Sequence, residues 1–398
     1  MQKKISLIII LLSSIYFVSQ FCRASLGVVA IDITADLNLN SEQIGRLGGI
    51  FFLSFALTQV PLGIILDAFN PIKIIILMLF VIFIGTYLFS ISENYTLLVL
   101  ARGLQGVGCG VCLMGPLVVL TKMLSARDFA YYSGLVMGLG GLGALFATEP
   151  FYYIVSHIGW SKSFYFFSFF ILFLIILLYL FPKEEKLETK NKINFNFKAF
   201  KTILFNKNFL LMLPMSMFGY ASAAFILTLW GGKFLSVVHS YKLENISLIL
   251  MFMALFWTLG SFSYGYIEKK INNKKLIITF SSMFMAFLIS LLCISSINNF
   301  IFIVILFCLL GFFGAFTLIL MAHYRILFEE EIIGKVLTTA NLFNFFGVFL
   351  TQWFTGVIIF NLNEKYGFSI ITSFNIAFMI IILCLLISTI FYLKTDEV

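Results

Sequence analysis

The chain has 398 residues, of which 61% are hydrophobic and only 11% are charged, with a formal net charge of +8 and a mean hydropathy of +1.06. Soluble domains carry about 25% charged residues, so this composition excludes a soluble globular protein. We therefore expect an all-α protein that lies within a lipid bilayer.

The N-terminal segment imitates a secretory signal, because Lys3 and Lys4 precede an apolar run. That run continues past Arg23 without a convincing small-residue cleavage site, whereas the apolar region of a signal covers only about 7–15 residues. We expect a first transmembrane helix that stays in the protein.

Twelve apolar segments are long enough to cross a bilayer core of about 30 Å, which takes roughly 20 residues. They are predicted at residues 5–33, 41–66, 71–92, 95–123, 128–155 and 161–182, and again at 208–237, 245–267, 275–296, 299–326, 333–360 and 368–392. The pattern predicts two sets of six transmembrane helices.

A polar stretch at 183–207, rich in lysine, separates the two sets. It predicts a cytoplasmic linker between an N-terminal six-helix bundle (1–182) and a C-terminal six-helix bundle (208–398). The linker is either simply solvated or, because of its basic excess, rests on anionic lipid headgroups.

The basic residues fix the expected orientation. With the N-terminus inside, Arg23 and Arg102 fall within the membrane, and nearly all the other basic residues fall at cytoplasmic ends and loops. The exceptions on the outer side are Arg46, Lys162, Lys233, Lys242 and Lys365. Cytoplasmic loops are enriched in Lys and Arg, so both termini are expected in the cytoplasm.

The loop after the second predicted helix begins Gly63-Ile-Ile-Leu-Asp67 and continues to Lys73. Gly63 allows two helices to approach closely, and Asp67 offers a charge that can meet helix N-termini or basic side chains between the bundles. A contact that forms in one conformation and breaks in another is what a gate requires. These three residues are our predicted gating motif.

The fourth predicted helix contains Arg102-Gly-Leu-Gln105-Gly106. Together with the loop motif, it resembles the signatures of the major facilitator superfamily, and the resemblance covers nearly the whole chain. It implies two six-helix bundles related as parallel repeats, and transport of a small molecule by alternating access. In its overall pattern the sequence is similar to nutrient-type bacterial members, including phagosomal transporters that bring amino acids and vitamins into intracellular bacteria.

The chain departs from the family pattern in two places. Ala68 and Asn70 stand where the loop motif usually has a basic residue and a glycine, which weakens the expected latch. The Gly-Pro pair of the antiporter signature is absent from the fifth predicted helix, where Gly134, Gly140 and Gly143 instead permit close packing. The missing signature favours uptake over drug export.

A polar stripe on the first helix carries Tyr16, Gln20 and Arg23 at helical spacing. Such a stripe on an apolar helix is expected to face a water-filled cavity. Arg23 suits a carboxylate, which a guanidinium grips with two hydrogen bonds. It is either a substrate ligand or a structural cation paired with a carboxylate or with backbone carbonyls.

Glu149 lies near the outer end of the fifth helix, beside Pro150. A carboxyl group in a low dielectric can carry a proton near neutral pH. Glu149 therefore either couples transport to protons, together with Arg102, or forms an ion pair with Arg102 or Arg23, or is simply wetted at the helix end.

Amide side chains recur on the eleventh helix at Asn341, Asn344 and Gln352. Buried amides need partners, so this stripe either binds substrate or hydrogen-bonds neighbouring helices. Trp230, near the outer end of the seventh helix, is interpreted as an interfacial anchor in preference to a stacking surface for substrate.

The sequence predicts proton-coupled uptake of a small anionic or zwitterionic nutrient, such as an amino acid or a carboxylate vitamin like pantothenate. Proton-driven efflux of a siderophore or drug is the alternative. A membrane enzyme is a remote third, because the three histidines are far apart and no enzyme motif is present. We expect a monomer in a bacterial inner membrane, without cofactor, metal or nucleic acid.

Overall fold

The computed structural model describes residues 2–180, 197–294 and 299–396, and every regular element in these ranges is helical. Helices of the first half are α1 Gln2–Ala24, α2 Leu26–Asp36, α3 Ser41–Ala68, α4 Pro71–Ser90, α5 Tyr95–Cys109, α6 Val111–Met123, α7 Ala126–Phe146, α8 Glu149–Ile158 and α9 Trp160–Leu180. Those of the second half are α10 Phe197–Leu204, α11 Lys207–Phe225, η2 Ile226–Trp230, α12 Gly231–Val238, α13 Leu243–Ile271, α14 Lys274–Leu292, α15 Phe300–Gly314, α16 Thr317–Leu327, α17 Glu330–Phe360, η3 Asn361–Lys365 and α18 Ile370–Tyr392.

The membrane spans agree with the twelve predicted segments. Among the described residues, eleven spans are long and apolar enough to cross a bilayer, and they become twelve when the bent pair α7 and α8 is taken as one span. Several spans consist of two helices in succession: α1 gives way to α2 at Ser25, and α5 to α6 at Gly110. The predicted fold, an all-α membrane protein of two six-helix bundles, is confirmed.

Short polar residues fix where the spans begin. Asn70 accepts a hydrogen bond from the Ile72 backbone at 3.0 Å, and Pro71 occupies the first turn of α4. Asn40 and Gln43 form a reciprocal capping box at the start of α3. Such caps satisfy backbone N–H groups that have no partner within the helix.

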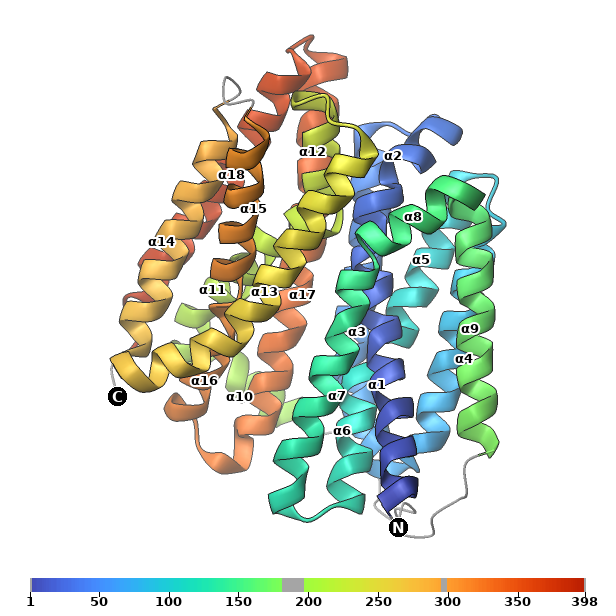
Figure 1. Ribbon diagram of the computed structural model, residues 1–398. Helices are drawn as coiled ribbons and strands as arrows, with labels where there is room; N and C mark the ends of the chain where they lie inside the picture. Colours follow the sequence, from blue (N-terminus) through green and yellow to red (C-terminus); the bar gives the residue numbers. More distant parts are fainter. Residues whose placement is uncertain (1, 181–196, 295–298, 397–398) are drawn as a thin grey trace.

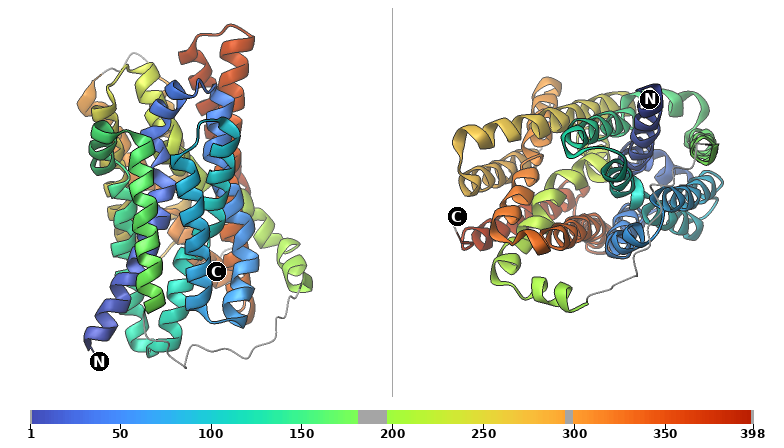
Figure 2. Two further views of the ribbon diagram at one scale, coloured as in Figure 1. Left: turned by 90° about the vertical axis from the view of Figure 1, so that its right-hand side faces the viewer. Right: turned by 90° about the horizontal axis from the view of Figure 1, so that it is seen from below.

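Figure 1 shows α1 to α9 on one side of the molecule and α11 to α18 on the other, with α3, α7 and α17 near the middle. Both chain ends lie toward the same end of the molecule (Figures 1 and 2). We call this the terminal face, and the opposite end, with the turns at 37–40, 239–242 and 366–369, the distal face.

The predicted linker at 183–207 lies mostly outside the described residues. Its described part contains one element that the sequence analysis did not predict, the helix α10. Ile203 of α10 is buried, and α10 contacts α11 and α17.

The two halves approach most closely near the distal face. A methyl group added at Gly27 of α2 would lie 2.7 Å from the Leu227 carbonyl oxygen of η2, and one at Gly45 of α3 would lie 2.6 Å from the Gln352 carbonyl oxygen of α17. Backbones can approach this closely in a membrane only where residues are small.

The membrane orientation of the faces remains a prediction, in which the terminal face is cytoplasmic. An alkaline phosphatase fusion at Lys192 should therefore be inactive, while a fusion at Lys242, in a distal turn, should be active in the periplasm. Enzyme activity in whole cells measures both. Activity at Lys192 would contradict the predicted topology.

Candidate substrate-binding site

The polar stripe predicted on the first helix forms a connected chain of side chains on α1. Gln20 Nε2 donates to the Tyr16 hydroxyl at 3.1 Å, and an Arg23 guanidinium N–H donates to Gln20 Oε1 at 3.4 Å. Tyr16 is buried, whereas Gln20 and Arg23 are half-buried. The i, i+3 and i+4 spacing places the three on one helix face.

Aromatic rings from both bundles enclose the Arg23 guanidinium. Its central carbon lies 4.5 Å from the centre of the Phe55 ring of α3 and 4.9 Å from that of Phe345 of α17. Tyr220 of α11 faces the same guanidinium and lies against Phe345, with ring centres 5.4 Å apart. Arg23 therefore lies where the two bundles meet, in contact with aromatic faces that favour a cation.

Arg23 has no ionic partner among the described side chains. Among the described residues, ion pairs join Arg46 to Glu42 and Lys274 to Glu268. Arg23 Nε is buried and has no hydrogen-bond acceptor. The guanidinium is thus held by a long hydrogen bond to Gln20, by the Tyr220 side chain and by ring faces, while its Nε–H is unused.

Arg102 has a different environment, inside the N-terminal bundle. It is 1% exposed and donates 2.9 Å hydrogen bonds to the Cys22 carbonyl and to Gln105 Oε1. Cys22 is in the last turn of α1, just before the break at Ser25, where helix carbonyls lose their backbone donors. Arg102, which belongs to α5, therefore caps the C-terminal end of α1.

The amides of α17 mostly serve contacts between helices. Asn341 donates to Gln59 of α3 at 3.3 Å, and Gln352 donates to Thr228 of η2 at 2.7 Å. Asn344 is buried, and its side-chain oxygen has no partner. The stripe thus lies at the interface between the bundles, and the side-chain oxygens of Asn344 and Gln352 are both acceptors without a partner.

Glu149 begins α8, at the bend of 44° between α7 and α8. Its carboxylate accepts a hydrogen bond from Ser247 of α13, which belongs to the other bundle. Glu149 forms no ion pair with Arg102 or Arg23 in this conformation. Pro150 and the bend direct Glu149 toward α13, and the structure shows this side chain as a contact between the bundles.

The predicted gating motif is only partly described. Lys73 is exposed at the start of α4, and the Asp67 side chain lies outside the described part of the structure. The expectation that Gly63 allows a close helix contact is wrong for this conformation, because an added methyl group would meet no atom within 4 Å. In the corresponding turn of the second half, Glu268 and Lys274 form an ion pair at 2.7 Å.

The interpretation of Trp230 as an interfacial anchor is also wrong. Its side chain is fully buried, and the indole N–H donates to the Gln352 carbonyl at 3.1 Å. Trp230 ends the π-helical turn η2 and packs between α3 and α17 at the distal face, where a methyl group added at Gly45 would lie 3.2 Å from the indole ring.

The sequence analysis missed the aromatic residues of other helices that surround Arg23, and also Gln59. Phe55, Tyr220 and Phe345 gave no signal, because aromatic residues make up 18% of the chain and occur on most of its spans. Gln59 did offer one, since it is a buried amide in an otherwise apolar part of α3.

Two helical bundles that meet around polar side chains at the middle of their interface define a class of membrane transporters built from repeats. The Major Facilitator Superfamily model matches residues 12–352. The chain belongs to this superfamily, as the resemblance in sequence predicted.

Three known proteins are similar to this chain at low sequence identity. An uncharacterized transporter of Buchnera aphidicola is 26% identical over 335 residues, which cover 78% of this chain and 79% of the relative. The "Probable sulfoacetate transporter" of Cupriavidus necator is 24% identical over 149 residues, which cover 37% of this chain and only 35% of that relative. A bacterial homolog of the human lysosomal transporter Spinster, solved inward-facing and unoccupied, superimposes with a TM-score of 0.76 at 17% identity, covering 98% of this chain and 97% of that one.

Proposed function

We propose that this protein takes up a small anionic or zwitterionic nutrient together with protons, across a bacterial inner membrane, by alternating access. An amino acid or a carboxylate vitamin is the substrate class that fits best. The observation that carries the proposal is Arg23, a guanidinium between the two bundles that lacks an ionic partner among the described residues.

A cation in this position requires compensation. Insertion scales assign roughly 2.5–3.5 kcal/mol to an arginine at the centre of a membrane helix, which is an upper value for Arg23 because it lies in the last turn of α1. The rings of Phe55 and Phe345 offset part of that cost. A bound carboxylate would supply the missing charge and two charge-assisted hydrogen bonds at once. The name of the Cupriavidus necator relative, which refers to an organic anion, supports the same substrate class.

Coupling to protons is assigned to Glu149. Its carboxylate is engaged by Ser247 of the opposite bundle in this conformation. Separation of the bundles at the distal face breaks this contact, so the surroundings of the Glu149 carboxylate change with the conformation. Such a dependence is what couples a proton to a conformational cycle.

The transport experiment uses right-side-out and inside-out membrane vesicles with radiolabelled acids. We expect right-side-out vesicles with an alkaline interior to accumulate a carboxylate substrate, and a protonophore to abolish the accumulation. The amide analogue of the same acid should not accumulate. Accumulation only in inside-out vesicles would contradict uptake and support export of a siderophore or drug.

Glu149→Gln separates coupling from movement of substrate. The amide keeps the size of the side chain but cannot titrate, so gradient-driven accumulation should fall at least tenfold while exchange of internal for external substrate continues. The matched control is Glu364→Gln, an exposed carboxylate of η3 at the same face. Equal loss of exchange and accumulation would show that Glu149 is needed only for folding or closure.

A further inference from the structure

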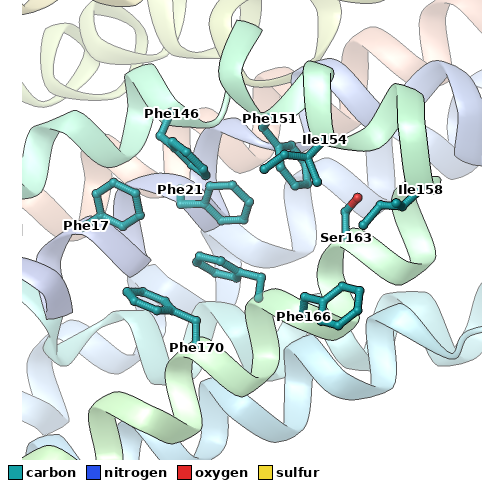
Figure 3. Close-up of a pocket in the computed structure, with 10 residues that line it drawn as sticks. Phe17, Phe21, Phe146, Phe151, Ile154, Ile158, Ser163, Phe166 and Phe170 are labelled. Atoms are coloured by element: carbon teal, nitrogen blue, oxygen red, sulfur yellow. The ribbon is translucent and has the colours of Figure 1, made fainter.

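A cavity lies on the outside of the N-terminal bundle, and Arg23 is not part of its lining. It has a volume of about 470 Å³ and lies between α1, α7, α8 and α9. Its lining consists of seven phenylalanines, two isoleucines and one serine, and Figure 3 shows the rings gathered around the opening. The volume is in the range of small-molecule binding sites, about 300–1,000 Å³.

The bend between α7 and α8 creates this cavity. Gly143 lets α7 lie directly against the Phe17 backbone of α1, whereas beyond the bend α8 diverges by 44°. Phe21 fills the floor below α8, with ring centres 3.9 Å from Phe167 and 4.7 Å from Phe151. Since Phe21 and Phe151 are almost completely buried, the floor is preformed.

The rim of the cavity faces the surrounding bilayer. Phe166 is 62% exposed, and Ile154 and Phe170 are also exposed, on helices at the outer side of the bundle (Figure 1). The one polar lining side chain, Ser163, already donates to the Gly159 carbonyl at 2.6 Å. Water needs two to four polar partners, so it does not fill a cavity of this composition.

Polar and basic side chains stand beside the cavity at the corner between α8 and α9. His157 and Lys162 are exposed there, next to the lining residues Ile158 and Ser163 respectively. Neither forms an ion pair among the described residues. Basic residues at the membrane surface attract anionic headgroups.

We propose that this cavity binds one acyl chain of an anionic phospholipid from the surrounding bilayer, with the headgroup at Lys162 and His157. The bound chain would lie against the back of α1. Phe17 and Phe21 line the cavity, while Tyr16 and Gln20 of the same helix belong to the Arg23 site. The cavity also includes Phe151, two residues after Glu149. The lipid would therefore stabilise both α1 and the bend that positions Glu149.

The proposal is tested with the full-length protein in lipid nanodiscs that contain phosphatidylglycerol with a photoreactive diazirine on one acyl chain. After illumination, labelled peptides are quantified by mass spectrometry. We expect label on peptides of the cavity at least fivefold above label at Phe262 and Phe280, which are exposed on the C-terminal bundle. Even labelling of all exposed faces would overturn the proposal.

Three variants sharpen the result. Ile154→Trp fills the cavity and should reduce its label at least fivefold, whereas Phe169→Trp, an exposed position of α9 outside the lining, should leave it unchanged. Lys162→Gln should remove the preference for phosphatidylglycerol over phosphatidylcholine carrying the same probe. Equal labelling by both lipids in the wild type would overturn the assignment of the headgroup. The wild-type measurements decide the matter even if a variant fails to fold.

Discussion

Replacement of Arg23 by lysine is expected to weaken binding of a carboxylate substrate at least tenfold while leaving expression unchanged. Lysine keeps the charge but loses the planar fork that holds both oxygens of a carboxylate. A hydrogen bond to a charged group contributes about 1.5–3 kcal/mol, so losing one corresponds to roughly a tenfold or larger change in affinity. Arg23→Gln, which removes the charge as well, is expected to abolish transport.

Equilibrium binding to purified protein measures the effect, with the acid and its amide compared for each variant. The wild type should prefer the acid, and the preference should disappear in both variants. Arg46→Lys is the matched control, because Arg46 is an exposed arginine already paired with Glu42 at 2.8 Å. An unchanged preference in Arg23→Lys would show that Arg23 is a structural cation.

Gly45→Ala is expected to prevent closure of the distal face and to lower transport at least tenfold. The added methyl group would lie 2.6 Å from the Gln352 carbonyl, 3.1 Å from the Gly356 backbone and 3.2 Å from the Trp230 ring. Two of these are main-chain atoms and the third belongs to a fully buried ring, so none can yield easily. The two bundles must separate to accommodate the methyl group.

Spin labels measure this separation. Ala35→Cys and Lys365→Cys place exposed labels on opposite bundles at the distal face, after the half-buried Cys293 and Cys384 have been replaced by alanine. The distance between the labels should increase in Gly45→Ala. The control is Gly134→Ala, where the methyl group meets no atom within 4 Å. Full transport and an unchanged distance in Gly45→Ala would refute the requirement for this contact.

The spans could be predicted closely because their signals are local. Apolar length fixes the number of crossings, and Asn70 with Pro71 marks the start of α4 at the predicted residue. Breaks within spans were not predicted. The break at Ser25 needs a donor for the Cys22 carbonyl, and that donor, Arg102, lies 80 positions further along the chain.

The candidate site, like the spans, could be predicted only in part. The helical period placed Tyr16, Gln20 and Arg23 on one face, and the structure joins them by hydrogen bonds. The periodicity of polar residues along one helix could not indicate that Phe55 and Phe345 enclose Arg23. Nor could it indicate that Ser247 is the partner of Glu149. These contacts depend on how the two bundles are placed against each other.

The capping of α1 by Arg102 has a consequence for the electric potential at the substrate site. Arg23 is in the last turn of α1, where the helix dipole places about half a negative charge that would repel an incoming anion. Arg102 donates to the Cys22 carbonyl in that same turn and opposes this negative end. An anion that approaches Arg23 therefore experiences the attraction of two guanidinium groups, although only one of them can touch it.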